Sequence, residues 1–181
     1  MHLAYLILAH KNPGQLKRLV SRLHNPNDYF YIHIDSKVDI KPFENELSDT
    51  SYNVQFIRKR EDARWGDMGL VLAALHGLKE IAASEIQFTH VSLLSGQDYP
   101  IQPLENIRIF FKENKAKSFI EAIPFPVKHL KYGGLHRVYS YSFNIGKSRE
   151  TYIPLKWKNN FNWKGQLLNL ALGAYCLFLP K

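Results

Sequence analysis

Short continuous apolar runs along this chain alternate with stretches in which apolar residues recur at helical spacing. Residues 3–9 ("LAYLILA") and 29–34 ("YFYIHI") are continuous apolar runs, typical of strands that are covered on both faces. Between them, residues 13–24 repeat apolar positions at helical spacing directly after Asn12, a residue type that caps helices at their N-termini. The pattern predicts a strand, a helix and a second strand.

The same alternation continues through the next hundred residues. It predicts a short helix or loop at 40–49, strands at 53–58 and 88–94, helices at 67–83 and 103–113, and a fifth strand at 118–123. Strands that alternate with helices predict an α/β fold with a mostly parallel, doubly wound sheet. In such a sheet the carboxyl ends of the strands share one edge, and ligands bind along that edge.

Polar side chains follow each of the first four predicted strands at the point where it ends. They are His10 and Lys11 after the first strand, Asp35, Ser36 and Lys37 after the second, the run 58–64 with Trp65 after the third, and Ser95 to Asp98 after the fourth. Because these positions converge on one edge of a parallel sheet, the sequence predicts a ligand site there.

The periodic pattern weakens after residue 124. Residues 135–143 alternate and predict an antiparallel strand, whereas residues 150–166 show no clear period. We therefore divide the chain into an α/β part at 1–123 and a basic, aromatic part of the same domain at 124–181.

The charge is uneven along the 181 residues, whose net charge is +8. Residues 1–107 hold 11 basic and 13 acidic side chains, and residues 108–181 hold 13 and 3. A basic half predicts an anionic partner such as phosphate, nucleic acid or a lipid surface, and a solvated lysine-rich surface is the alternative. The N-terminal apolar run is too short for a membrane span and lacks the form of a signal peptide, so we expect a cytoplasmic protein with peripheral membrane contact through its basic part.

Several common sites are excluded by the sequence. "GKS" at 146–148 lacks the glycine that a phosphate-binding P-loop needs at position 141, where Tyr141 stands. The single Cys176 excludes an internal disulfide and a paired-cysteine zinc site. Neither a Gly-rich dinucleotide-binding turn nor a Gly-x-Ser-x-Gly elbow is present, and no Asp-x-Asp pair occurs.

Four segments in series resemble the core-2/I-branching β-1,6-N-acetylglucosaminyltransferase family, which includes the peptide O-xylosyltransferases. They are "YLILAHKNPGQLKRLVSRL", "YIHIDSK", "RWGDMGLVLAALHGL" and "VSLLSGQDYPI". The resemblance implies a GT-A-like fold and inverting transfer of N-acetylglucosamine or xylose from a UDP-sugar to a glycan or protein hydroxyl. It also implies that basic residues, rather than a metal ion, stabilise the departing diphosphate, so we expect no metal cofactor.

By its motif positions, the resemblance assigns residues to two sides of the site. The donor-binding residues it implies are His10, Lys11, Asp35, Lys37, Trp65, Gly96 and Asp98, and the acceptor-binding residues are Glu121 and Arg137. Alternative interpretations stay open: Asp35 and Asp98 as turn caps, and Trp65 as a core residue. His33, His76 and His90 are interpreted as structural.

The resemblance also implies a catalytic base that this chain does not match anywhere. We expect that base beyond Lys181, so that the chain is an N-terminal fragment that binds nucleotide weakly and catalyses nothing. The alternative function is a non-catalytic basic domain that binds nucleic acid or an anionic membrane surface. A metal-dependent enzyme of the same fold would need a paired carboxylate that the sequence lacks.

Overall fold

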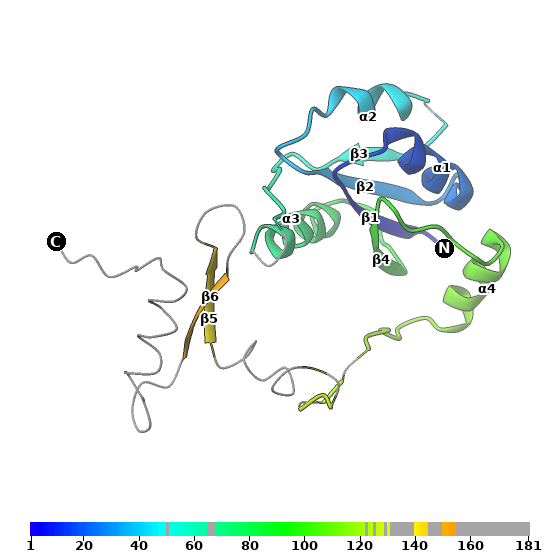
Figure 1. Cartoon of the computed structure of the whole chain (residues 1–181). Coiled ribbons are helices and arrows are strands. Elements are labelled where there is room, and N and C mark those ends of the chain that lie inside the picture. The colour runs from blue at the N-terminus through cyan, green and yellow to red at the C-terminus, as the bar shows by residue number, and fades with distance from the viewer. Residues whose placement is uncertain are drawn as a thin grey trace, which may run out of the picture. The chain divides into compact units, whose positions relative to one another are not determined.

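The computed structural model of the chain describes residues 1–49, 51–64, 68–121, 123–124, 126–128, 130, 140–144 and 150–154. It divides into two compact units, Met1–Ile120 and Glu121–Lys181, and each is described by itself. In the second unit, β5 (Ser140–Asn144) and β6 (Glu150–Pro154) form an antiparallel pair (Figure 1). The strand predicted at 135–143 is thus confirmed for its described residues, and residues 135–139 lie outside them.

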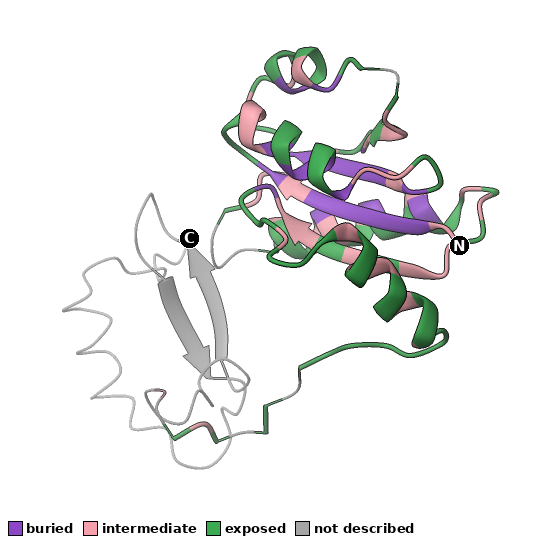
Figure 2. Cartoon of the chain, turned by 90° about the vertical axis from the view of Figure 1, so that its right-hand side faces the viewer, coloured by how far each residue is buried: buried purple, intermediate pink, exposed green. Residues whose placement is uncertain are grey.

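The first unit is built on a four-stranded sheet in the order β3-β2-β1-β4. Its strands are β1 (Leu3–Ala9), β2 (Tyr29–Ile34), β3 (Val54–Phe56) and β4 (His90–Ser95). All neighbouring strands are parallel. The two central strands, β1 and β2, are buried along most of their length (Figure 2), which accounts for their continuous apolar sequences.

Helices lie on both faces of this sheet. They are α1 (Pro13–Leu23), α2 (Lys41–Glu46), α3 (Gly69–Ala82) and α4 (Leu104–Glu113). Side chains of α1, α2 and α4 pack against one core, whereas α3 contributes Ile81 to the core on the other face. This arrangement confirms the α/β, GT-A-like class that the sequence predicts.

Helix α1 begins directly after Asn12, as predicted, but the Asn12 side chain does not cap it. Asn12 is the N-cap residue, but its side chain makes no capping hydrogen bond. Its backbone lies in the left-handed region at φ 55, which asparagine tolerates better than most residues. The Asn12 carbonyl accepts hydrogen bonds from the amides of Gln15 (2.9 Å) and Leu16 (3.2 Å).

The fifth strand predicted at 118–123 is wrong, because the described residues of this stretch, 118–121 and 123, form no strand. The chain leaves α4 through a turn in which Ala116 has φ 63. The Phe119 ring then lies 4.9 Å from that of Phe110 on α4 and 6.3 Å from that of His90. Phe119 thus packs on aromatic side chains, whereas Ile120 is 85% exposed, and the described residues of the run gain no backbone ladder.

A buried ion pair ties α4 to the amino ends of β1 and β2. Asp28, with 0% of its surface exposed, accepts a hydrogen bond from the amide of Leu3 at 3.0 Å. Its other carboxylate oxygen pairs with the guanidinium of Arg108 from α4. A carboxylate buried this deeply depends on such partners, because leaving it unpaired costs several kcal/mol.

Within the part of the chain that the structure describes, no helix has both the length and the apolar character needed to cross a membrane.

Candidate functional site

The segments that follow β1, β2 and β4 start side by side at the carboxyl edge of the sheet. The amide of Asp35 donates to the carbonyl of Ala9 at 2.9 Å, and the amide of Gly96 donates to the carbonyl of Leu8 at 2.8 Å. His10 follows Leu8 and Ala9 along the chain and is exposed, and Lys11 is likewise exposed. The predicted convergence of polar residues on this edge is therefore realised for three of the four strands by backbone geometry.

Asp35 is buried at this edge, with 4% of its surface exposed. Its Oδ1 accepts the amide of Lys37 at 2.9 Å, and its Oδ2 accepts the amide of Ala63 at 3.2 Å. The ammonium of Lys37 lies 3.8 Å from the same Oδ2. The carboxylate thus does cap its own turn, and it also joins the segment after β2 to the segment after β3.

Arg60, in the segment after β3, joins the same two segments through its side chain. Its Nε donates to the carbonyl of Ile34 at 2.9 Å, and its Nη2 donates to the carbonyl of Asp35 at 2.7 Å and to that of Val38. Three carbonyl acceptors suit a planar guanidinium with five N–H donors. Sequence reasoning did not single out Arg60. The charged run that directly follows a predicted strand was the signal that could have found it.

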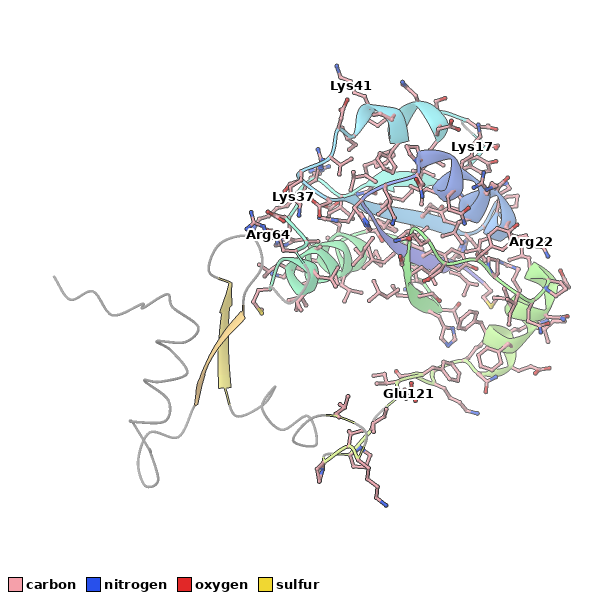
Figure 3. All side chains as sticks on the ribbon, viewed as in Figure 1. Lys17, Arg22, Lys37, Lys41, Arg64 and Glu121 are labelled. Carbon is pink, nitrogen blue, oxygen red and sulfur yellow. The ribbon has the colours of Figure 1, made fainter. Side chains whose placement is uncertain are left out.

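Two cations and a carboxylate form a row at this edge. The Lys37 ammonium lies 2.7 Å from Oδ1 of Asp62, and Nε of Arg64 lies 2.9 Å from Oδ2. Figure 3 shows Lys37 and Arg64 beside one another. The hydrogen bond from Lys37 is the main cause that lowers the pKa of Asp62, and the one from Arg64 adds to it. Both cations are about half exposed, so each reaches solvent while it is paired with Asp62.

Two histidines fix the segment after β3 against the sheet and α3. Nε2 of the buried His33 accepts the amide of Glu61 at 2.9 Å, so this nitrogen carries no proton. Burial lowers the pKa of His33, which favours the same neutral form. His76 of α3 bonds the Glu61 carboxylate at 2.8 Å, and this bond lowers the pKa of Glu61. Both histidines therefore hold structure at this edge.

The turn after β4 is seated directly on β1. A β-carbon at Gly96 would lie 2.7 Å from the β-carbon of Ala9, so only glycine fits without movement. Asp98 is exposed, and its Oδ2 accepts the amide of Ser95 at 2.8 Å. Its own amide donates to the Ser95 carbonyl at 3.0 Å. Asp98 thus closes the turn that precedes it and does not cap α4.

The structure describes only one of the three remaining predicted residues. Trp65 and Arg137 lie outside the described residues, and Glu121 is an exposed residue at the start of the second unit. Among the residues that the structure describes, no group of three or more His, Cys, Asp or Glu side chains is arranged to hold a metal ion. The described donor-side residues thus gather at one edge, with Asp35 and Lys37 in direct contact.

Most of the chain matches a known protein family. A family model described as core-2/I-branching enzyme matches residues 3–166 of the chain. Xylosyltransferase oxt of Drosophila pseudoobscura pseudoobscura is 29% identical over 108 residues, which cover 59% of this chain and 12% of that protein. N-acetyllactosaminide β-1,6-N-acetylglucosaminyl-transferase of Homo sapiens is 27% identical over 123 residues, which cover 67% and 31%.

A third relative matches over a longer stretch of this chain. Xylosyltransferase sqv-6 of Caenorhabditis elegans is 27% identical over 169 residues, which cover 89% of this chain and 21% of that protein. The chain therefore spans less than a third of the length of each of these three relatives.

Proposed function

The chain belongs to the core-2/I-branching enzyme family, and we propose that its first unit binds the nucleotide part of a UDP-sugar donor for glycosyl transfer. The observation that carries the proposal is the buried Asp35 carboxylate at the carboxyl end of β2. It lies at the edge where parallel α/β sheets bind their ligands. The names of the relatives support xylose or N-acetylglucosamine as the sugar, with a glycan or protein hydroxyl as the acceptor.

In this proposal each described residue has a chemical task. Asp35 uses its two carboxylate oxygens, which together offer about four acceptor positions, to accept an N–H or hydroxyl of the nucleoside beyond the two amides it already holds. Lys37 and Arg64 supply positive charge near the diphosphate, where cations stabilise the charge that develops as UDP departs.

The other predicted residues complete the two sides of the proposed site. Gly96 and Asp98 shape the wall on the β4 side, and His10, Lys11 and Trp65 border the donor. Glu121 and Arg137 stay predictions for the acceptor side, and we assign the catalytic base to none of the described residues.

We further propose that the donor binds without a divalent metal. Support comes from the absence of an Asp-x-Asp pair in the 181 residues and from the exposed cations at the edge, which can stabilise phosphate charge as a metal would. UDP binding that is unchanged by a chelator is the expected outcome. A requirement for manganese would contradict it.

The test is calorimetric titration of the chain with UDP in the presence and absence of EDTA. We expect Asp35→Asn to weaken UDP binding at least tenfold, since a charge-assisted hydrogen bond contributes about 1.5–3 kcal/mol. Asp49→Asn is the matched control, because Asp49 also accepts a backbone amide two residues on, from Ser51 at 2.9 Å, but precedes β3 at the opposite edge.

The competing function is a basic module that binds nucleic acid or an anionic membrane. Its affinity would fall steeply with salt and would not change in Asp35→Asn. Such a result with single-stranded RNA or phosphatidylserine vesicles, together with no UDP binding, would overturn the proposal. If UDP binds, competition by UDP-xylose and UDP-N-acetylglucosamine then identifies the preferred sugar.

A further inference from the structure

We propose that Arg60 is a positioning residue of this site, which holds the segment Asp35–Val38 in the conformation that presents Asp35 and Lys37 to the ligand. The inference rests on the proposed function for its effect on nucleotide binding. The loop-holding role itself can be measured without any ligand.

The need for such a residue follows from how short β3 is. The ladder between β2 and β3 ends at the pair Ile32 and Phe56, with one further bond from the amide of Ile57 to the carbonyl of Ile32. The carbonyls of Ile34 and Asp35 lie beyond that ladder on the chain. Both accept hydrogen bonds from Arg60, so its guanidinium takes the place of the strand that β3 does not provide.

The contacts of Arg60 also span the turn itself. It bonds the carbonyl of Ile34 before the turn and that of Val38 after it, which fixes both ends of the segment at once. A lysine ammonium is a point charge on a flexible stem and cannot present the same planar fork of donors. We therefore expect that Arg60→Lys only partly replaces it.

Two neighbouring hydrogen bonds connect the segment that carries Arg60 to Asp35 and its turn. The amide of Ser36 donates to the carbonyl of Glu61 at 3.1 Å, and the amide of Ala63 donates to Oδ2 of Asp35 at 3.2 Å. Both link the segment after β2 to residues that directly follow Arg60. Release of the guanidinium would therefore loosen the amide donor to Asp35 as well as the backbone that carries Asp35.

A simple loss of stability is the alternative explanation, and Arg108 provides the matched control for it. Arg108 is also a partly buried arginine in charge-assisted contacts, with Asp28 and the carbonyl of Met1. It acts at the amino ends of the strands, however, so Arg108→Gln should lower the unfolding temperature without changing the UDP affinity of the folded protein.

The first measurement is amide hydrogen exchange of the 181-residue chain. All four amides of residues 35–38 are hydrogen bonded, so they are protected in the wild type. We expect Arg60→Gln to raise their exchange about tenfold or more while exchange in α1 stays unchanged, because the opening is local. Arg60→Lys should give an intermediate rate. Unchanged exchange at 35–38 would overturn the inference.

The second measurement is UDP affinity in a double-mutant cycle with Asp35→Asn. We expect Arg60→Gln to weaken UDP binding at least tenfold in the wild-type background and less than twofold in the Asp35→Asn background, because Arg60 acts through Asp35. Equal losses in both backgrounds would contradict that role and show an independent effect.

The two measurements separate the inference from the proposed function. If the wild type does not bind UDP but exchange at 35–38 rises in Arg60→Gln, the proposed function fails and the loop-holding role of Arg60 stands. If the wild type and Arg60→Gln bind UDP equally well, the proposed function stands and the inference fails.

Discussion

Replacement of Gly96 by alanine tests how tightly the turn after β4 is seated on β1. The added β-carbon would lie 2.7 Å from the β-carbon and 3.3 Å from the α-carbon of Ala9. Neither atom is the end of a flexible side chain, so the backbone of one of the two segments must move. The hydrogen bond of 2.8 Å from the Gly96 amide to the carbonyl of Leu8 opposes that movement.

The magnitude follows from two opposing effects. Overpacking of a filled contact costs about 1–3 kcal/mol, whereas the loss of glycine's freedom in the unfolded chain returns about 0.4–1 kcal/mol. We therefore expect Gly96→Ala to lower the free energy of unfolding by about 1–2 kcal/mol, measured by urea denaturation. Gly14→Ala is the control, because nothing lies within 4 Å of its added β-carbon, and it should be neutral or stabilising.

A second substitution identifies the contact responsible. Ala9→Gly alone removes a buried methyl group and should cost about 1 kcal/mol. In the double variant the clashing β-carbon is gone, so the total cost should be smaller than the sum of the two single costs by about 1 kcal/mol or more. Strict additivity, or a Gly96→Ala protein as stable as the wild type, would refute the close approach between the two segments.

Two further predictions concern groups buried in the same unit. Asp28→Asn should lower the free energy of unfolding by about 3–5 kcal/mol, because it leaves the guanidinium of Arg108 without its carboxylate; a loss under 1 kcal/mol by urea denaturation would contradict the buried ion pair. For His33, burial lowers the pKa in the folded state, so the unfolded chain binds the proton more readily. The free energy of unfolding should therefore be highest above a pH of about 6.5. Below that pH it should fall by at most about 1.4 kcal/mol per pH unit. His33→Gln should flatten this slope between pH 7.5 and 5.5, and a slope that stays unchanged would exclude His33 as its source.

The central strands and the edge of the candidate site could be predicted because each leaves a local pattern in the sequence. β1 and β2 are continuous apolar runs, since both of their faces are covered, and this leaves a direct mark on the sequence. Asp35 follows such a run, and parallel topology alone then places it at the ligand-binding edge. Its cap function and its proposed ligand function could not be separated by sequence, because one carboxylate can serve both.

What the sequence did not reveal depends on contacts between distant segments. Arg60 stands in a run of charged residues, and nothing local distinguishes the one that turns back onto carbonyls some 25 residues earlier. The stretch 118–121 has strand-like composition, but the contact between the rings of Phe119 and Phe110 on α4 competes with strand pairing. Propensity could not reveal this outcome, because it does not report that Phe119 finds ring partners on α4 while Ile120 stays 85% exposed.

The brevity of β3 limits how far the sheet itself fixes the backbone at the carboxyl edge. With only three residues in the strand, the sheet fixes the backbone up to Phe56, and side-chain contacts of the following residues define the geometry beyond it. The backbone at this edge is thus set partly by the strands and partly by the side chains of residues 58–64. A substitution at Arg60 or Glu61 should therefore change the backbone at this edge, through the bonds of their side chains to Ile34 and His76, more than the apolar packing of β1 and β2.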